Sequence, residues 1–246
     1  GEGKRYDVVF IGGGPATISF ICYLFQQRKV DKFLRQVNLI VIEKNENFGS
    51  GCLGNYGINT NTASEGFARL ICYSEEKKFK KLGLSPTLKP MKMSKDYNKM
   101  IFKKVEEKEE DRVKYKPIPA FMNLFKSSSV QTLVSIGNRP APLGLVGYYL
   151  DNLGNYMTDY INAFYNKNIL MNKTEVKEVK IYNNEEFGIR IIRDGKEDFI
   201  KSRAVIMATG GVQTTGKFLN EIKKVKGNEN VYISDNILQK EGYMDM

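Results

Sequence analysis

The sequence predicts an α/β fold in which a parallel sheet is flanked by helices and carries a small antiparallel sheet. The first observation is an apolar, β-branched run at residues 6–11 that ends in three glycines and leads directly into a helix-like segment. A second apolar strand follows at residues 37–43, and strand, helix and strand in this order form a βαβ unit. The third observation is a set of strand-like segments within residues 173–201, which indicates antiparallel pairing.

Two main helices are predicted from apolar positions at helical spacing, over residues 15–28 and 142–166. Each segment opens with a proline, Pro15 and Pro142, which suits the first turn of a helix. The positions expected to be buried are Ile18, Ile21, Cys22, Leu24 and Phe25 in the first helix, and Val146, Tyr149, Leu150, Leu153, Tyr156, Met157, Tyr160, Ile161 and Phe164 in the second.

The remaining elements are shorter. Short helices are expected at residues 64–71 and 120–125, the latter followed by a Ser-rich turn. The expected strands are 168–171, a hairpin of 174–181 with 187–192, a long strand over 199–207 and a last strand at 231–234, with a helix at 218–225.

Two long connections stand out. Residues 45–62 are rich in Gly, Asn and Ser, and without periodicity they predict an irregular loop that approaches a ligand, with a plain connector as the alternative. Residues 73–140 are interpreted as an insertion or lid within one domain that spans residues 1–246.

Composition excludes several classes of protein. No apolar run reaches the roughly 18 residues that span a bilayer, and no signal peptide is seen, so we expect the cytoplasm or a reducing organelle. Three cysteines at wide spacing form neither a disulfide framework nor a zinc pattern. The net charge of +10 comes from lysines spread along the chain. Nucleic acid is therefore an allowed partner that the pattern does not favour.

The chain contains no histidine. Every mechanism with a histidine base and every metal site with histidine ligands is therefore excluded. The chemistry must come from a cofactor or from Cys, Tyr, Lys, Asp or Glu. No metal site is expected, and no catalytic residue can be named from the sequence.

The glycine turn carries the main functional prediction. Gly12 and Gly14 fit the first two positions of the G-x-G-x-x-G motif, and Thr17 stands at the third. The first glycine allows the tight turn and the second lets backbone approach a pyrophosphate. The helix that starts at Pro15 and Ala16 presents free N–H groups to the phosphates. Thr17 puts the close packing of helix and sheet in doubt.

Glu43 ends the second strand, where a carboxylate accepts hydrogen bonds from the hydroxyls of an adenosine ribose. Its distance from Gly12 is longer than the usual roughly 20 residues, and residues 27–34 can take up the excess. An acid here disfavours NADP at this site. The alternative is an exposed carboxylate at a strand end.

Three segments together resemble the FAD-binding domain of the two-dinucleotide-fold, glutathione-reductase-like flavoproteins: residues 11–16 (Ile-Gly-Gly-Gly-Pro-Ala), Glu43-Lys44, and residues 207–211 (Met-Ala-Thr-Gly-Gly). The resemblance implies a Rossmann-like FAD-binding fold and FAD as cofactor. It implies that Val176 lies beside the adenine and that residues 48–61, with Gly51, line the flavin. It also assigns Ala208, Thr209 and Gly210 to the family's second signature, and Asp235 to the ribityl chain, with a helix N-cap as the alternative for Asp235.

Cys52 lies in a segment that is similar to the redox-active segment of disulfide reductases. The second cysteine of that motif is replaced by Gly57, so a dithiol relay is disfavoured. We expect Cys52 to be a buried structural cysteine, with a thiol that acts beside the flavin as the alternative.

The sequence therefore predicts a flavin-dependent oxidoreductase that takes electrons from NAD(P)H and passes them to an unidentified acceptor. The second glycine motif is missing, so we expect either that the chain is a piece of a longer flavoprotein, which the end at Met246 favours, or that the reductant reaches the flavin without a dedicated domain. Three alternatives stay open: an FAD-dependent RNA-modifying or RNA-binding protein, a dehydrogenase that uses NAD alone, and a flavoprotein fragment without turnover.

Overall fold

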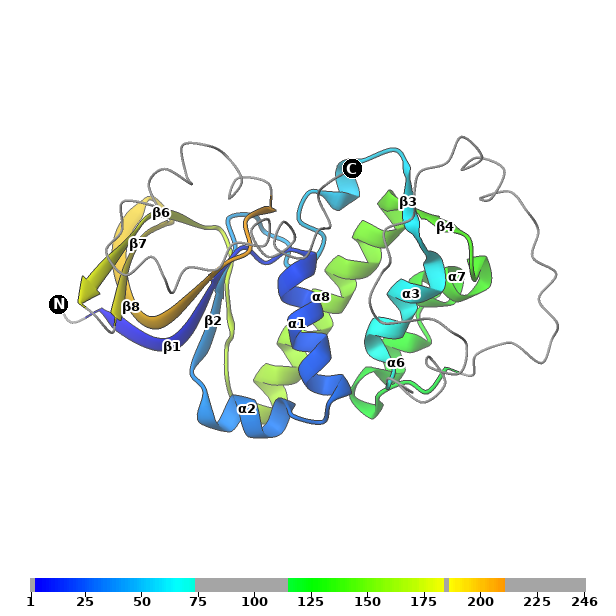
Figure 1. Ribbon diagram of the computed structural model, residues 1–246, viewed down its shortest axis with the longest axis horizontal. Helices are drawn as coiled ribbons and strands as arrows, with labels where there is room; N and C mark the ends of the chain where they lie inside the picture. The colour runs from blue at the N-terminus through cyan, green and yellow to red at the C-terminus, as the bar shows by residue number, and fades with distance from the viewer. Residues whose placement is uncertain (1–2, 74–114, 184–185, 211–246) are drawn as a thin grey trace, which may run out of the picture. The chain divides into compact units, whose positions relative to one another are not determined.

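The computed structural model describes residues 3–73, 115–183 and 186–210, and it confirms the α/β fold (Figure 1). The strands are β1 (Lys4–Ile11), β2 (Leu39–Ile42), β3 (Asn59–Ala63), β4 (Pro140–Pro142), β5 (Leu170–Met171), β6 (Thr174–Asn183), β7 (Glu186–Arg193) and β8 (Lys196–Met207). Six of them form one sheet in the order β5-β2-β1-β8-β7-β6. The pairs from β5 to β8 are parallel, whereas β8, β7 and β6 pair antiparallel. The small antiparallel sheet is thus a continuation of the parallel one.

The helices are α1 (Pro15–Gln26), α2 (Val30–Gln36), α3 (Ser64–Ala68), α6 (Met122–Phe125), α7 (Ser128–Ile136) and α8 (Leu143–Tyr165), with single 3-10 turns η1 (Leu53–Asn55), η2 (Arg69–Ile71) and η4 (Pro119–Phe121). The helices predicted in the described part of the chain occur in the predicted order, and α2 and α7 are additional to them. Pro15 starts α1 as expected. The excess length before β2 is taken up by α2, which extends the crossover without disturbing the βαβ unit.

The sheet has a separate apolar core on each face. On β1 and β2, Phe10 and Val41 pack with α1 and α8, while Ile11 and Ile42 pack with β6 and β7 on the other face. Because neighbouring strand residues point to opposite faces, such continuous apolar strands suit burial on both sides. Figure 1 shows α1 and α8 side by side on one face and the hairpin of β6 and β7 curled over the other.

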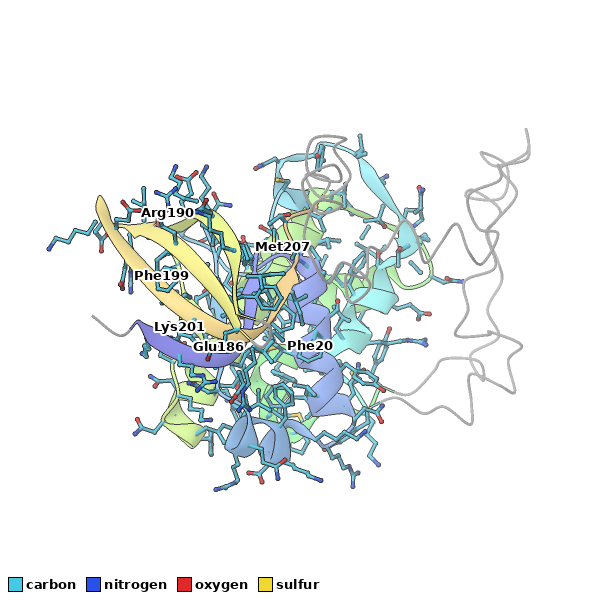
Figure 2. The ribbon with its side chains drawn as sticks, turned by 60° about the vertical axis from the view of Figure 1, so that its left-hand side comes forward. Phe20, Glu186, Arg190, Phe199, Lys201 and Met207 are labelled. Atoms are coloured by element: carbon cyan, nitrogen blue, oxygen red, sulfur yellow. The ribbon has the colours of Figure 1, made fainter. Side chains whose placement is uncertain are left out.

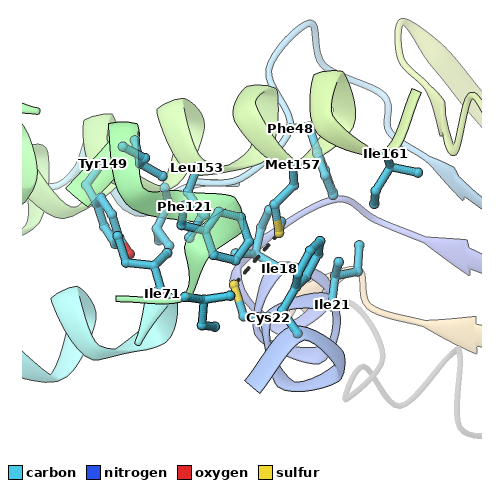
Figure 3. Packing of buried hydrophobic residues seen from close by; sticks show 14 of the residues in the cluster. Ile18, Ile21, Cys22, Phe48, Ile71, Phe121, Tyr149, Leu153, Met157 and Ile161 are labelled. Atoms are coloured by element: carbon cyan, nitrogen blue, oxygen red, sulfur yellow. Dashed lines mark hydrogen bonds between the residues drawn. The ribbon is translucent and has the colours of Figure 1, made fainter. Parts of the chain in front are cut away.

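The helical core is densely filled with apolar side chains (Figure 3). The residues on α1 that were expected to be buried are all buried. On α8 most of them are buried as well, but Phe164 is 69% exposed, so its assignment to the core was wrong. The Cys22 thiol of α1 contacts the Met157 sulfur of α8 at 3.8 Å, and the Tyr149 hydroxyl donates to the carbonyl oxygen of Phe67 at 3.0 Å.

Strand β8 joins the two parts of the sheet. Its last residues, up to Met207, pair with β1, and its first residues pair with β7. The Phe199 ring covers Gly188, where a side chain would collide with it. Figure 2 labels Phe199 with Arg190, which is ion-paired with Glu197 at 2.8 Å. This strand therefore fixes the hairpin relative to β1.

Two predictions of local structure were wrong. The Ser-rich segment after residue 125 is the helix α7, whose Val130 and Leu133 are fully buried, and not a turn. The segment 45–62 is not irregular throughout, because it contains η1 and most of β3, which pairs with β4. Next to this pair of strands, the Ser64 N–H donates to the Arg139 carbonyl oxygen at 2.8 Å.

The chain divides into two units, residues 1–75 with 95–208, and residues 76–94 with 209–246. Of the second unit the structure describes only Thr209 and Gly210. The helix expected at 218–225 and the strand at 231–234 lie outside the described residues, as does most of the segment interpreted as an insertion or lid. Its part from 115 to 140 is described, and Phe121 and Leu133 belong to the helical core. Over the described ranges, no helix is both long enough and apolar enough to span a bilayer.

Candidate functional site

The turn between β1 and α1 is built around Gly12. Its φ of +106° is a conformation that only glycine adopts readily, and its N–H donates to the Ile42 carbonyl oxygen of β2 at 2.8 Å. The Thr17 hydroxyl donates back to the Gly12 carbonyl oxygen at 2.7 Å. Gly12 is therefore held from both sides, by the neighbouring strand and by its own helix.

Thr17 takes the place of the third glycine without opening the fold. Its side chain is fully buried, and its hydroxyl is satisfied by the turn itself. The helix still packs on β1 through Ile18, which is also fully buried. The doubt that Thr17 raised about this packing is removed.

Glu43 directly follows β2 and is only 6% exposed. One carboxylate oxygen accepts the Gly13 N–H at 2.7 Å, and the other accepts the Asn45 N–H at 2.7 Å. Each carboxylate oxygen has a second lone pair, so the carboxylate retains acceptor capacity for a ribose hydroxyl. The role of Glu43 toward a ribose stays a prediction, and the alternative of an exposed strand-end carboxylate is wrong.

The surrounding structure excludes a side chain at Gly13 but not at Gly14. A side chain on Gly13 would start 2.6 Å from the Phe48 ring, so packing alone excludes one. Gly14 has φ −81° and ψ −168°, an extended conformation that any residue adopts. A Cβ on Gly14 would meet only Gly51 Cα, at the ordinary distance of 3.9 Å. Nothing in the described fold requires glycine at position 14.

The first turn of α1 presents free hydrogen-bond donors. The N–H groups of Gly14, Ala16 and Thr17 have no acceptor within the described residues, and Pro15 has no N–H to offer. No acidic side chain stands in this turn. Free amides together with the positive end of the helix dipole suit an anion such as phosphate.

The loop of residues 48–54, part of the segment 45–62 that was predicted to approach a ligand, borders this turn. The Gly49 N–H donates to the Gly13 carbonyl oxygen at 2.8 Å, and the Ser50 N–H donates to an Asp151 carboxylate oxygen on α8 at 2.8 Å. Sequence analysis named Phe48 only within the stretch 48–61 expected to line the flavin, gave Gly13 no role of its own within the glycine motif, and missed Asp151. A signal for the last was present, because Gly147 and Gly154 lie seven residues apart, on the same side of α8 as Asp151.

Gly51 follows in this loop with φ +54° and faces Gly14 and Pro15. Cys52 is exposed, so the expectation of a buried structural cysteine was wrong. The other two cysteines are buried, and burial raises the pKa of the Cys22 thiol to about 12. Cys52 is thus the accessible thiol of this chain.

The other predicted positions are distributed around the same strand ends. The Lys44 ammonium is exposed and pairs with Glu175 at 3.3 Å. Half-buried Val176 lies on β6, two residues after Thr174, whose N–H donates to the Glu43 carbonyl oxygen at 3.0 Å. The Ala208 N–H donates to the Ile11 carbonyl oxygen at 2.8 Å, which places the end of β8 next to the glycine turn.

The last predicted residues belong to the second unit. The Thr209 hydroxyl oxygen is buried and has no hydrogen-bond partner among the described residues, and Gly210 has φ +72°. Asp235 lies outside the described residues. In the ranges that the structure describes, no three acidic, cysteine or histidine side chains are grouped as metal ligands. Within the described residues of the first unit, the groups available to a ligand are the amides at the start of α1 and the Glu43 carboxylate.

No protein-family model and no curated protein matches the chain. Among solved structures, it is similar to the FAD-bound cadaverine monooxygenase DfoA of Erwinia amylovora, with 14% identity and a TM-score of 0.47 over 84% of this chain and 36% of that one. It is also similar to the ornithine hydroxylase PvdA of Pseudomonas aeruginosa, with 12% identity and a TM-score of 0.46 over 89% of this chain and 42% of that one. For a flavoprotein/dehydrogenase from Cytophaga hutchinsonii, the identity is 11% and the TM-score is 0.40 over 88% of this chain and 42% of that one. The chain thus spans less than half of each, and these values are too low to assign a function.

Proposed function

We propose that this chain binds FAD through the β1–α1 turn and belongs to a flavin-dependent oxidoreductase that draws electrons from NAD(P)H. The observation that carries the proposal is Gly14, which neither backbone conformation nor packing requires to be a glycine. A missing side chain beside free amides leaves room for a diphosphate to approach the backbone.

The residues present fit an adenosine diphosphate group. The amides of Gly14, Ala16 and Thr17 would hold the phosphates, and Glu43 would accept from the ribose hydroxyls. Gly51 lies against the same turn from the neighbouring loop, and Val176 of β6 would lie beside the adenine. Bound FAD would supply the electron-transfer chemistry.

The test is the variant Gly14→Ala, with binding measured by calorimetric titration of FAD into the purified chain. Alanine fits the unliganded turn, so we expect an unchanged unfolding midpoint together with FAD binding that is about tenfold weaker or worse. Gly13→Ala is the contrasting variant, because its methyl collides with Phe48 and should lower stability itself.

Two further measurements separate the alternatives. ADP should compete with FAD, and FMN should not, because the described groups suit the diphosphate and the adenosine ribose. Anaerobic addition of NADH or NADPH should bleach the visible band of the bound flavin. Failure of the wild-type chain to bind FAD, or equal binding by Gly14→Ala, would overturn the proposal.

A further inference from the structure

Helix α8 receives the loop of residues 48–54 in a trough of its own surface. Gly147 and Gly154 remove side chains that would otherwise collide with Gly54 and with the Phe48 carbonyl oxygen. The Phe48 ring is fully buried and lies against the backbone of Gly13. One helix face, with a repeat of seven residues, is thus shaped to hold this loop beside the glycine turn.

Two hydrogen bonds fix the middle of the loop. Gly49 is tied to the Gly13 carbonyl oxygen, and Ser50 is tied to the Asp151 carboxylate, each at 2.8 Å. Gly49 itself, at φ +145°, is too close to Leu150 of α8 to carry a side chain. The loop is therefore clamped between the turn and α8 at consecutive residues.

The clamp determines where Gly51 lies. A Cβ on Gly51 would be 3.5 Å from the Pro15 ring and 3.6 Å from Gly14 Cα. The backbone of Gly51 thus lies against Gly14 and Pro15, where the glycine turn leads into α1. Ser50 is the last anchored residue before it, and its anchor is a side chain 101 positions further along the chain.

We propose that Asp151 is a positioning residue for the cofactor: by holding the Ser50 N–H it keeps Gly51 against the phosphate-binding turn. The inference rests on the proposed FAD site and adds α8 to it. A carboxylate near a diphosphate would repel it, but this one is engaged by a backbone N–H and acts through Ser50 and Gly51.

The experiment compares Asp151→Ala, Asp151→Asn and Asp159→Ala with the wild-type chain. Asparagine keeps an oxygen that can accept the Ser50 N–H, whereas alanine removes it. Asp159 is an exposed carboxylate two turns further along α8 and serves as the matched control. The readouts are amide hydrogen exchange of residues 48–54 without FAD, the dissociation constant for FAD, and the circular dichroism of the bound flavin.

We expect Asp151→Ala to speed exchange at Gly49 and Ser50, to weaken FAD binding about tenfold or more and to alter the flavin dichroism. Asp151→Asn and Asp159→Ala should stay close to wild type in all three. Unchanged exchange in Asp151→Ala, or unchanged FAD affinity and dichroism, would overturn the positioning role. Absence of FAD binding by the wild-type chain would instead overturn the proposed function. The exchange data would still show whether Asp151 holds the loop of residues 48–54 in place.

Discussion

Glu43 has a structural task that precedes any role toward a ligand. Its two carboxylate oxygens accept the N–H groups of Gly13 and Asn45 at the point where the chain leaves β2. A buried N–H without an acceptor costs about 1–3 kcal/mol. The carboxylate therefore stabilises the same turn whose amides face the proposed phosphate site.

The variant Glu43→Gln should reveal this task. The glutamine amide has one oxygen, and its NH2 group would face the second N–H as donor to donor. We expect the free energy of unfolding in urea to fall by about 1–3 kcal/mol. The control is Glu46→Gln, because Glu46 is an exposed side chain whose ion pair with Lys173 contributes about 1 kcal/mol at most. Equal stability of the two variants would contradict the structural task.

The sequence predicted Gly12, Gly14 and Glu43 as site residues because the motif that contains them has a short, known spacing. Asp151 was missed because its partner Ser50 is far away in sequence and the bond uses a backbone N–H. Cys52 was placed wrongly because a cysteine is usually buried, and only the path of the loop exposes it.

At the scale of elements, α8 serves both the core and the loop. One side carries fully buried side chains such as Leu153 and Met157, and its small residues form the trough for residues 48–54. The apolar stripe predicted the first role. The second requires glycines inside a helix, which cost about 1 kcal/mol each relative to alanine, and close packing against the loop offsets that cost.

Gly154→Ala should therefore destabilise the protein although alanine favours helix. Its methyl would overlap the Phe48 carbonyl oxygen, and forced displacement in a packed region costs about 1–3 kcal/mol. Gly144→Ala is the matched control on the same helix, because no atom lies within 4 Å of its added methyl. Thermal unfolding should show a lower midpoint for Gly154→Ala and an unchanged or slightly higher one for Gly144→Ala. A higher unfolding midpoint for both variants would contradict the close packing of Gly154 against the loop of residues 48–54.

Elements with strong local patterns were predicted and those fixed by distant partners were not. The period of α1 and the apolar run of β1 identify them without tertiary contacts. In α7, four of the nine residues are Ser or Thr, and Val130 and Leu133 are the buried apolar residues, so the local pattern resembled a turn. Strand β3 is polar and forms by pairing with β4, and no local sequence pattern predicts that pairing.

At the scale of the whole described unit, β1 separates two cores that depend on different partners. The helical core joins α1, α8 and the helices after residue 115, whereas the other joins β1 and β2 to the hairpin. The sequence predicted the strands of both. It did not predict that a single strand, β8, would carry the parallel sheet over into the hairpin, because that depends on the register of two pairings.

The helical core should make stability fall at alkaline pH. Burial raises the pKa of the Cys22 thiol from 9.0 to about 12, so between these values the unfolded chain loses this proton while the folded chain keeps it. Below pH 9.0 the thiol has no effect, and above it the free energy of unfolding falls by about 1.4 kcal/mol per pH unit. Cys22→Val fills the same apolar site without a proton to lose. Urea unfolding at about pH 7 and about pH 10 should show a smaller alkaline loss for the variant, and equal losses would mean that the folded core tolerates a thiolate.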